Sequence, residues 1–142
     1  MSRVQLALRV ADLDASVRFY SKLFDIEPAK LRRGYANFAI AEPPLKLVLI
    51  EGQAGDETRL DHLGVEVAST DEVAEATDRL TTAGLATFEE NDTSCCYALQ
   101  DKVWVTGPGN EPWEVYVVNA DTNDLLKVTD TSTCCHHPPH RQ

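Results

Sequence analysis

Two adjacent cysteines, Cys95 and Cys96, carry the most distinctive chemistry of this 142-residue chain. Neighbouring Cα atoms are about 3.8 Å apart, which is short of the separation of roughly 4.4 to 6.8 Å that a disulfide prefers. We therefore interpret the pair as free thiols. Soft thiolates bind thiophilic ions, and two adjacent sulfurs can chelate one trivalent arsenic atom that still carries an organic group.

The alternative is that these cysteines are small buried hydrophobic residues, which is the commonest role of a free cysteine. The pair follows the polar run Glu89–Ser94. Such a run is typical of surface loops, which carry binding and catalytic residues more often than the elements that they connect. We therefore expect a mobile, accessible loop that presents the two thiols.

A second group of residues, Gln5, His62 and Glu114, could bind a metal ion. An amide oxygen, an imidazole and a carboxylate together suit Fe(II), Mn(II), Ni(II) or Co(II). A set of only three leaves coordination positions open, which favours catalysis over a structural role. Two alternatives remain: His62 is a structural histidine, or Gln5 is a polar residue on a strand face. Glu114 lies on a predicted strand, where an unpaired buried charge is costly.

An internal repeat indicates how these residues are positioned. Gln5–Val10 aligns with His62–Val67, and each predicted strand is followed by a polar break and an amphipathic helix. The first helix is expected to begin near Asp12, and the second to open with a capping box at Ser69–Glu72 and to end at Gly84. Further strands are predicted at Ala36–Ile40, Leu45–Ile50, Ala98–Val105 and Trp113–Val118.

Each half therefore reads as βαβββ, which predicts an α+β fold with two modules, 1–52 and 60–120, within one domain of residues 1–120. Their strands are expected to form a curved, cup-shaped mixed sheet with the helices outside. In the repeat His62 falls in register with Gln5, and Lys46 with Glu114. Three of these four equivalent positions hold possible ligands. The remaining stretch, 121–142, is expected to be a disordered tail whose cysteines and histidines could bind metal: Cys134, Cys135, His136, His137 and His140.

The composition excludes several classes of partner. A net charge of −10 and a pI near 4.7 argue against a nucleic acid or an anionic membrane, because both require clustered Lys and Arg. No stretch reads as a signal peptide or a membrane span. We expect a cytoplasmic monomer or homodimer whose cysteines are thiols.

These motifs together resemble the vicinal oxygen chelate superfamily and, within it, the arsenic-inducible and cadmium-induced proteins, which include ferrous-iron carbon–arsenic bond lyases. The resemblance covers about residues 1–120. Its most specific segments are Phe19–Phe24, Lys46–Glu51, Asp61–Val65, Asn91–Tyr97, Asp101–Val105 and Pro112–Tyr116.

The resemblance implies a glyoxalase/bleomycin resistance/extradiol dioxygenase fold and an enzyme that uses Fe(II) and O₂. Its substrates would be trivalent organoarsenicals, such as methylarsenite and reduced aromatic arsenicals, and its product arsenite. Cys95 and Cys96 would bind arsenic. The metal ligands would be His62, Glu114 and Gln5, a position where iron dioxygenases of the superfamily usually have histidine and some glyoxalase relatives glutamine. Tyr97, Lys102 and Tyr116 are candidate accessory residues.

Two other functions remain possible from the sequence. A non-catalytic protein could sequester cadmium or arsenic through its thiols and the histidines of the tail. A glyoxalase-like, metal-dependent isomerase or lyase would have no use for Cys95 and Cys96. Replacement of both cysteines by serine separates the second alternative from the lyase.

Overall fold

The computed structural model describes residues 2–95 and 98–121. Cys96, Tyr97 and residues 122–142 lie outside this part of the chain, and so does the predicted tail apart from Asp121. The elements follow one another as two βαβββ halves, as the repeat predicts: β1 (Arg3–Val10), α1 (Leu13–Phe24), β2 (Lys30–Arg32), β3 (Tyr35–Ile40), β4 (Leu45–Glu51), β5 (Arg59–Glu66), α2 (Thr70–Thr82), β6 (Phe88–Cys95), β7 (Ala98–Thr106) and β8 (Pro112–Asp121).

The chain divides into two compact units, which we call the first unit (Arg3–Leu63) and the second unit (Gly64–Gln142 together with Met1–Ser2). The division falls inside β5 rather than in the segment before it, where the repeat boundary is predicted. Strand pairing explains this difference. β5 begins the second repeat, but it pairs with β1 of the first unit, so part of β5 groups with that unit.

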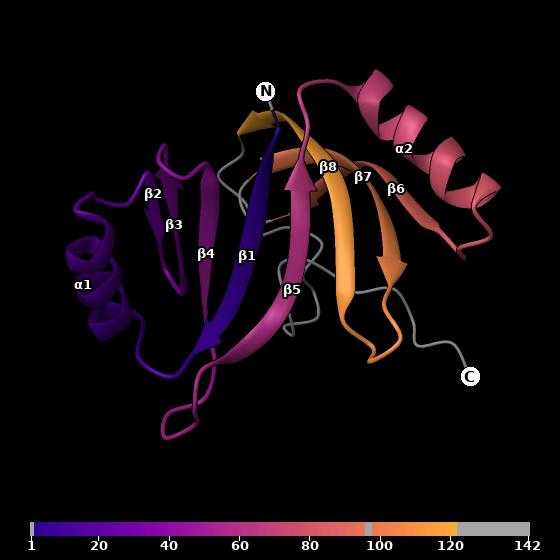
Figure 1. The fold of residues 1–142 in the computed structure, drawn as a ribbon. Coiled ribbons are helices and arrows are strands. Elements are labelled where there is room, and N and C mark those ends of the chain that lie inside the picture. Colours follow the sequence, from indigo (N-terminus) through magenta and orange to yellow (C-terminus); the bar gives the residue numbers. More distant parts are fainter. Residues whose placement is uncertain (1, 96–97, 122–142) are drawn as a thin grey trace. The chain divides into compact units, whose positions relative to one another are not determined.

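In the first unit the strand order is β2-β3-β4-β1-β5 (Figure 1). β1 and β4 pair in parallel, and Gln5 lies directly opposite Lys46. β3 pairs antiparallel with both β2 and β4. The two repeat-equivalent positions of the first half are therefore cross-strand neighbours.

Helix α1 begins where the sequence predicts, because the Asp12 side chain accepts a hydrogen bond from the Ala15 N–H at 3.0 Å. The chain leaves the helix at Asp25, which has a left-handed φ of 54°. The apolar side of α1 contacts one face of the sheet. The buried cluster there contains Val10, Leu13, Ala36, Phe38, Ile40, Leu47 and Leu49.

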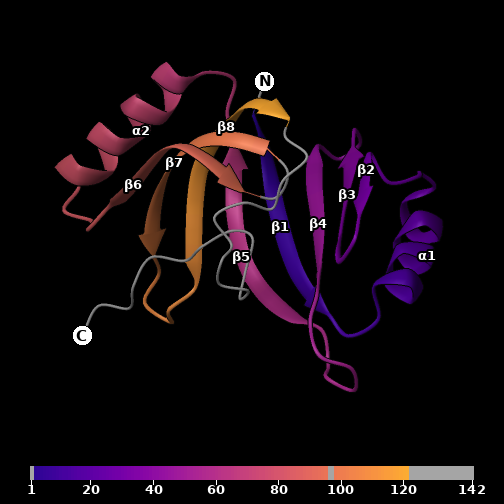
Figure 2. The same ribbon diagram turned by 180° about the vertical axis from the view of Figure 1, so that it is seen from behind.

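In the second unit the strand order is β5-β8-β7-β6, and β7 pairs antiparallel with both β8 and β6. Ser69 caps α2 by accepting the Glu72 N–H at 3.2 Å, and the helix is followed by Gly84 with a φ of 90°. Figure 2 shows α2 alongside β6 and β7. Neither helix of the described residues is long and apolar enough to cross a membrane.

The prediction of a loop at Glu89–Ser94 is wrong, because this polar run belongs to strand β6. β6 is an edge strand with β7 as its single neighbour. An edge strand buries little on either face, so charged side chains there carry no desolvation cost and protect the edge from further pairing. Glu89, Asn91 and Asp92 are all exposed.

The Asp12 cap gives a stability prediction. Asp12→Ala removes the acceptor of the Ala15 N–H and should lower the free energy of unfolding by about 1 kcal/mol. Urea denaturation measures this value. Asp12→Asn, which keeps a side-chain acceptor, serves as the control and should remain near the original stability; an equal loss in both variants would contradict the cap.

Candidate functional site

In both units the sheet face opposite the helix carries buried polar residues. Side chains alternate between the two faces of a strand. In β1, Leu6, Leu8 and Val10 pack in the cluster beside α1, so Gln5 lies on the other face. In the second unit Val103, Val115 and Val117 pack beside α2, and four large residues occupy the opposite face: Lys102, Trp104, Glu114 and Tyr116.

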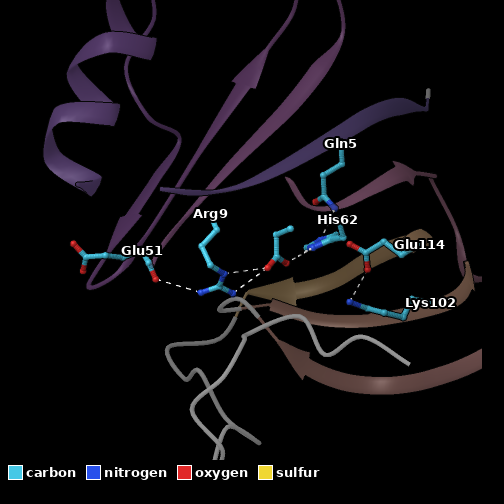
Figure 3. Close-up of polar contacts among 7 residues, drawn as sticks. Gln5, Arg9, Glu51, His62, Lys102 and Glu114 are labelled. Atoms are coloured by element: carbon cyan, nitrogen blue, oxygen red, sulfur yellow. Dashed lines mark hydrogen bonds and ion pairs between the residues drawn. The ribbon is translucent and has the colours of Figure 1, made fainter. Parts of the chain in front are cut away.

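His62 is completely buried on β5, and its two ring nitrogens have different partners. The Nδ1 atom lies 2.7 Å from Oδ2 of Asp61, and the Nε2 atom lies 3.2 Å from the amide nitrogen of Gln5. A carboxylate only accepts hydrogen bonds, so Nδ1 is the protonated nitrogen. Nε2 then carries a lone pair directed at Gln5 (Figure 3).

Arg9 holds the other oxygen of the Asp61 carboxylate. Its Nε and Nη2 atoms donate to Oδ1 at 3.2 and 3.0 Å, and its Nη1 atom donates to the carbonyl oxygen of Glu51 at 3.3 Å. Burial by itself would raise the pKa of Asp61, but its hydrogen bonds and electrostatic interactions with His62 and Arg9 outweigh burial and hold this pKa below its ordinary value. Arg9, Asp61, His62 and Gln5 therefore form one hydrogen-bonded chain in the first unit.

The second unit contains a buried ion pair. Nζ of Lys102 lies 2.8 Å from Oε1 of Glu114, and both side chains are almost completely inaccessible. The ammonium group also lies 5.5 Å from the centre of the Trp104 ring and 6.0 Å from that of Tyr116. The Tyr116 hydroxyl donates to Glu66 at 3.2 Å. Lys102 thus neutralises Glu114 and is stabilised in turn by two aromatic faces.

The chemistry of these residues fits a divalent metal ion. Metal-binding histidines usually donate their second N–H to a carboxylate, as His62 does to Asp61, and this fixes the lone pair on the ligating nitrogen. Gln5 adds an amide and Glu114 a carboxylate. No group of three or more His, Cys, Asp and Glu side chains suited to a metal occurs in residues 2–95 and 98–121. The Gln5 amide, which contacts His62, is a ligand type outside that set.

The structure brings together some of the predicted residues. Gln5 contacts His62 in the first unit, and Glu114 contacts Lys102 in the second. Cys95 is the last residue of β6 and pairs with Ala98 of β7. Cys96 and Tyr97 lie outside the described residues, so the arsenic-binding role of the thiols stays a prediction.

Asp61 and Arg9 were missed as members of the site. The sequence contained a hint of both residues, because Asp61 directly precedes His62 and Arg9 shares a strand face with Gln5. Neighbouring residues of a strand normally point to opposite faces, so a direct contact between Asp61 and His62 could not be expected from alternation.

Comparison with known proteins identifies the family. Residues 3–115 match the model of the Glyoxalase/Bleomycin resistance protein/Dioxygenase superfamily. This chain belongs to that superfamily. The resemblance inferred from the motifs is therefore confirmed at the level of the family.

Two relatives within the superfamily are similar over most of their length. The trivalent organoarsenical cleaving enzyme of Thermomonospora curvata is 71% identical over 135 residues, which cover 95% of this chain and 89% of the relative. The cadmium-induced protein CadI of Mycobacterium tuberculosis is 63% identical over 122 residues, which cover 86% of this chain and 80% of the relative.

A solved structure supports the predicted fold. The Mn(II)-bound glyoxalase from Novosphingobium aromaticivorans matches with a TM-score of 0.60 at 22% identity, covering 89% of this chain and 44% of the glyoxalase chain. The two helices and the mixed, open sheet are those of the glyoxalase/extradiol dioxygenase fold, as predicted.

The buried ion pair gives a second stability prediction. Lys102→Met keeps the length of the side chain but leaves Glu114 without its cation, and should lower the unfolding free energy of the metal-free protein by about 3 to 5 kcal/mol. Chemical denaturation with a chelator present measures this loss. The double variant Lys102→Met, Glu114→Gln removes both charges and should recover most of it; a double variant no more stable than the single one would refute the charge-pair explanation.

Proposed function

We propose that this protein cleaves the carbon–arsenic bond of trivalent organoarsenicals and releases arsenite, with Fe(II) as its metal and O₂ as its oxidant. The observation that carries the proposal is the 71% identity, over 95% of this chain, to the organoarsenical cleaving enzyme of T. curvata. The buried histidine with its carboxylate partner supplies the chemical basis for a metal-dependent reaction.

We propose Gln5, His62 and Glu114 as the metal ligands. The direct pairing of Gln5 with Lys46 supports this assignment, because these residues are the repeat equivalents of His62 and Glu114. Bound Fe(II) would supply the redox chemistry that activates O₂ at its open positions. Mn(II), Ni(II) or Co(II) could replace it in isolated protein.

We propose that Cys95 and Cys96 bind the arsenical. Their thiols would displace the two hydroxyl groups of methylarsenite, forming two sulfur–arsenic bonds and two water molecules while the carbon–arsenic bond stays intact. Capture in this way fixes the reacting bond in position, and such proximity can lower a barrier by about 7 to 11 kcal/mol in favourable models.

Other residues have supporting roles in this proposal. Arg9 and Asp61 hold the His62 ring in the tautomer that presents Nε2 as a ligand. Lys102 is an accessory residue that balances the charge of Glu114, and Tyr116 is oriented by its hydrogen bond to Glu66. Tyr97 stays an accessory candidate by its position next to the thiols.

A second candidate function is sequestration of a thiophilic metal without turnover. It is favoured by the 63% identity to a cadmium-induced protein and by the four cysteines of the chain. Sequestration requires neither His62 nor O₂, whereas the lyase requires both.

A turnover experiment separates these two functions. Purified, iron-loaded protein should release arsenite from methylarsenite over many turnovers in the presence of O₂ and none without it. His62→Ala and the double variant Cys95→Ser, Cys96→Ser should each lose at least 100-fold of the rate, because they remove a metal ligand and the arsenic ligands. Arsenical bound in a fixed ratio, with no arsenite released, would instead support sequestration.

A further prediction concerns the contribution of Asp61 to metal binding. Asp61→Asn removes the negative charge that fixes the His62 tautomer, and should weaken binding of the metal about 10- to 100-fold. Titration calorimetry with Co(II), which does not oxidise readily, measures the affinity without turnover. Asp14→Asn is the control, because it makes the same change at an exposed residue of α1. Equal affinities in the two variants would disprove a role for Asp61 at the metal.

A further inference from the structure

Gly52 directly follows β4 and lies beside the last residue of β1. Its N–H donates to the carbonyl oxygen of Val10 at 2.7 Å, next to the parallel pairing of the two strands. Its φ is outside the left-handed region, unlike those of Gly34, Gly55 and Gly84. The backbone conformation at position 52 therefore does not by itself require a glycine.

The side chain of Arg9 occupies the space beside Gly52. A Cβ atom at position 52 would lie 2.8 Å from Cγ and 3.2 Å from Cδ of Arg9. Nonbonded carbon atoms are most stable about 3.5 to 4.0 Å apart. The two crowded atoms belong to the middle of the side chain, and the guanidinium group beyond them is held by three hydrogen bonds. The absence of a Cβ atom at Gly52 thus leaves room for the path of Arg9.

The guanidinium group of Arg9 serves two acceptors in one orientation. Nε and Nη2 donate to Oδ1 of Asp61, and Nη1 donates to the carbonyl oxygen of Glu51. Only 13% of the Arg9 side chain and 6% of the Asp61 side chain are exposed. The donors of a guanidinium group have fixed directions in one plane. A displaced Arg9 side chain could therefore not keep all three hydrogen bonds.

The carboxylate of Asp61 passes this constraint on to His62. Its Oδ1 atom accepts from Arg9, and its Oδ2 atom lies 2.7 Å from Nδ1 of His62. The two oxygens belong to one planar group, so the donors on Oδ1 fix the direction of Oδ2. Figure 3 shows these groups joined in one series of hydrogen bonds from Glu51 to His62. All members of the series belong to the first unit.

We propose that Gly52 is a positioning residue for metal binding: without a Cβ atom, it lets Arg9 reach the Asp61 carboxylate that orients His62. The inference rests on the proposed role of His62 as a metal ligand. Gly52 is not itself a ligand and acts only through Arg9. A purely structural role would make the effect of a Cβ atom at position 52 independent of Arg9.

The test uses the full-length chain in which five other possible metal-binding side chains are replaced, which leaves His62 as the only histidine of the sequence. These replacements are Cys134→Ser, Cys135→Ser, His136→Gln, His137→Gln and His140→Gln. Titration calorimetry measures the affinity for Co(II), and His62→Ala should abolish this binding. Nitrogen-15 NMR of the metal-free protein shows which ring nitrogen of His62 carries the proton; we expect Nδ1.

Two single variants and their combination measure the coupling. Arg9→Ala and Gly52→Ala should each weaken Co(II) binding about 10-fold, the low end of the effect of partners of metal-binding histidines. In both, the nitrogen-15 signals of the two ring nitrogens should move toward each other, because the carboxylate no longer fixes one tautomer. The double variant should stay within about twofold of Arg9→Ala, because the new Cβ atom then meets no Cγ; independent effects would multiply to about 100-fold.

Gly55→Ala is the matched control for a loss of stability. It makes the same substitution three residues later, where φ is 89° and a Cβ atom would meet nothing within 4 Å. Alanine is strained at that φ, so this variant should be less stable but should keep its Co(II) affinity within about twofold and its ring-nitrogen signals unchanged. If Gly52→Ala does not fold, the double variant decides: a folded double variant with the affinity of Arg9→Ala supports the role, and an unfolded one overturns it.

The outcomes for the two proposals differ. The positioning role is overturned if Gly52→Ala binds Co(II) like the parent protein, if Gly55→Ala weakens binding equally, or if the effects of Gly52→Ala and Arg9→Ala multiply. If the parent protein binds Co(II) through His62 but releases no arsenite from methylarsenite, the lyase proposal fails while the affinities still decide the role of Gly52. Binding of Co(II) that survives His62→Ala, or no binding by the parent protein, would overturn both the metal assignment and the role of Gly52.

Discussion

Neutralisation of buried charge is the constraint on which the rest of this structure depends. Each unit uses one sheet face for an apolar cluster under its helix and leaves polar residues on the other. A buried charge without a partner costs free energy of folding. Each buried charge described above accordingly has an opposite charge or several hydrogen bonds. The ion pairs of Arg9 with Asp61 and of Lys102 with Glu114 stabilise the charges on these faces.

These pairs also prepare the residues for chemistry. Lys102 keeps the buried Glu114 carboxylate neutralised in the metal-free protein. A histidine whose Nδ1 is already bonded to a carboxylate has its ligating lone pair in place before any metal arrives. If these residues bind a metal as proposed, the energy needed to organise them is spent during folding, and less of it opposes binding.

The sequence predicts the repeated elements well because their signals are local. Hydrophobic alternation and capping residues mark the strands and helices within a few positions, and the starts at Asp12 and Ser69 are where the sequence places them. β6 was missed because an edge strand shows neither alternation nor burial. The Asp61–His62 contact and the pairing of Lys102 with Glu114 depend on side-chain directions and cross-strand register, which spacing along the chain does not reveal.

The duplication bears on why the proposed metal centre would be single rather than double. Its four equivalent positions are held by Gln5, Lys46, His62 and Glu114, and Gln5 and Lys46 are direct neighbours on β1 and β4. An ammonium group has no lone pair to offer a metal and repels it, so Lys46 removes a ligand and places a positive charge beside Gln5. A neutral amide tolerates that charge better than a second imidazole, which could be protonated. In the proposed site, glutamine at position 5 and lysine at position 46 would be linked, because a neutral amide beside an ammonium group adds no second positive charge.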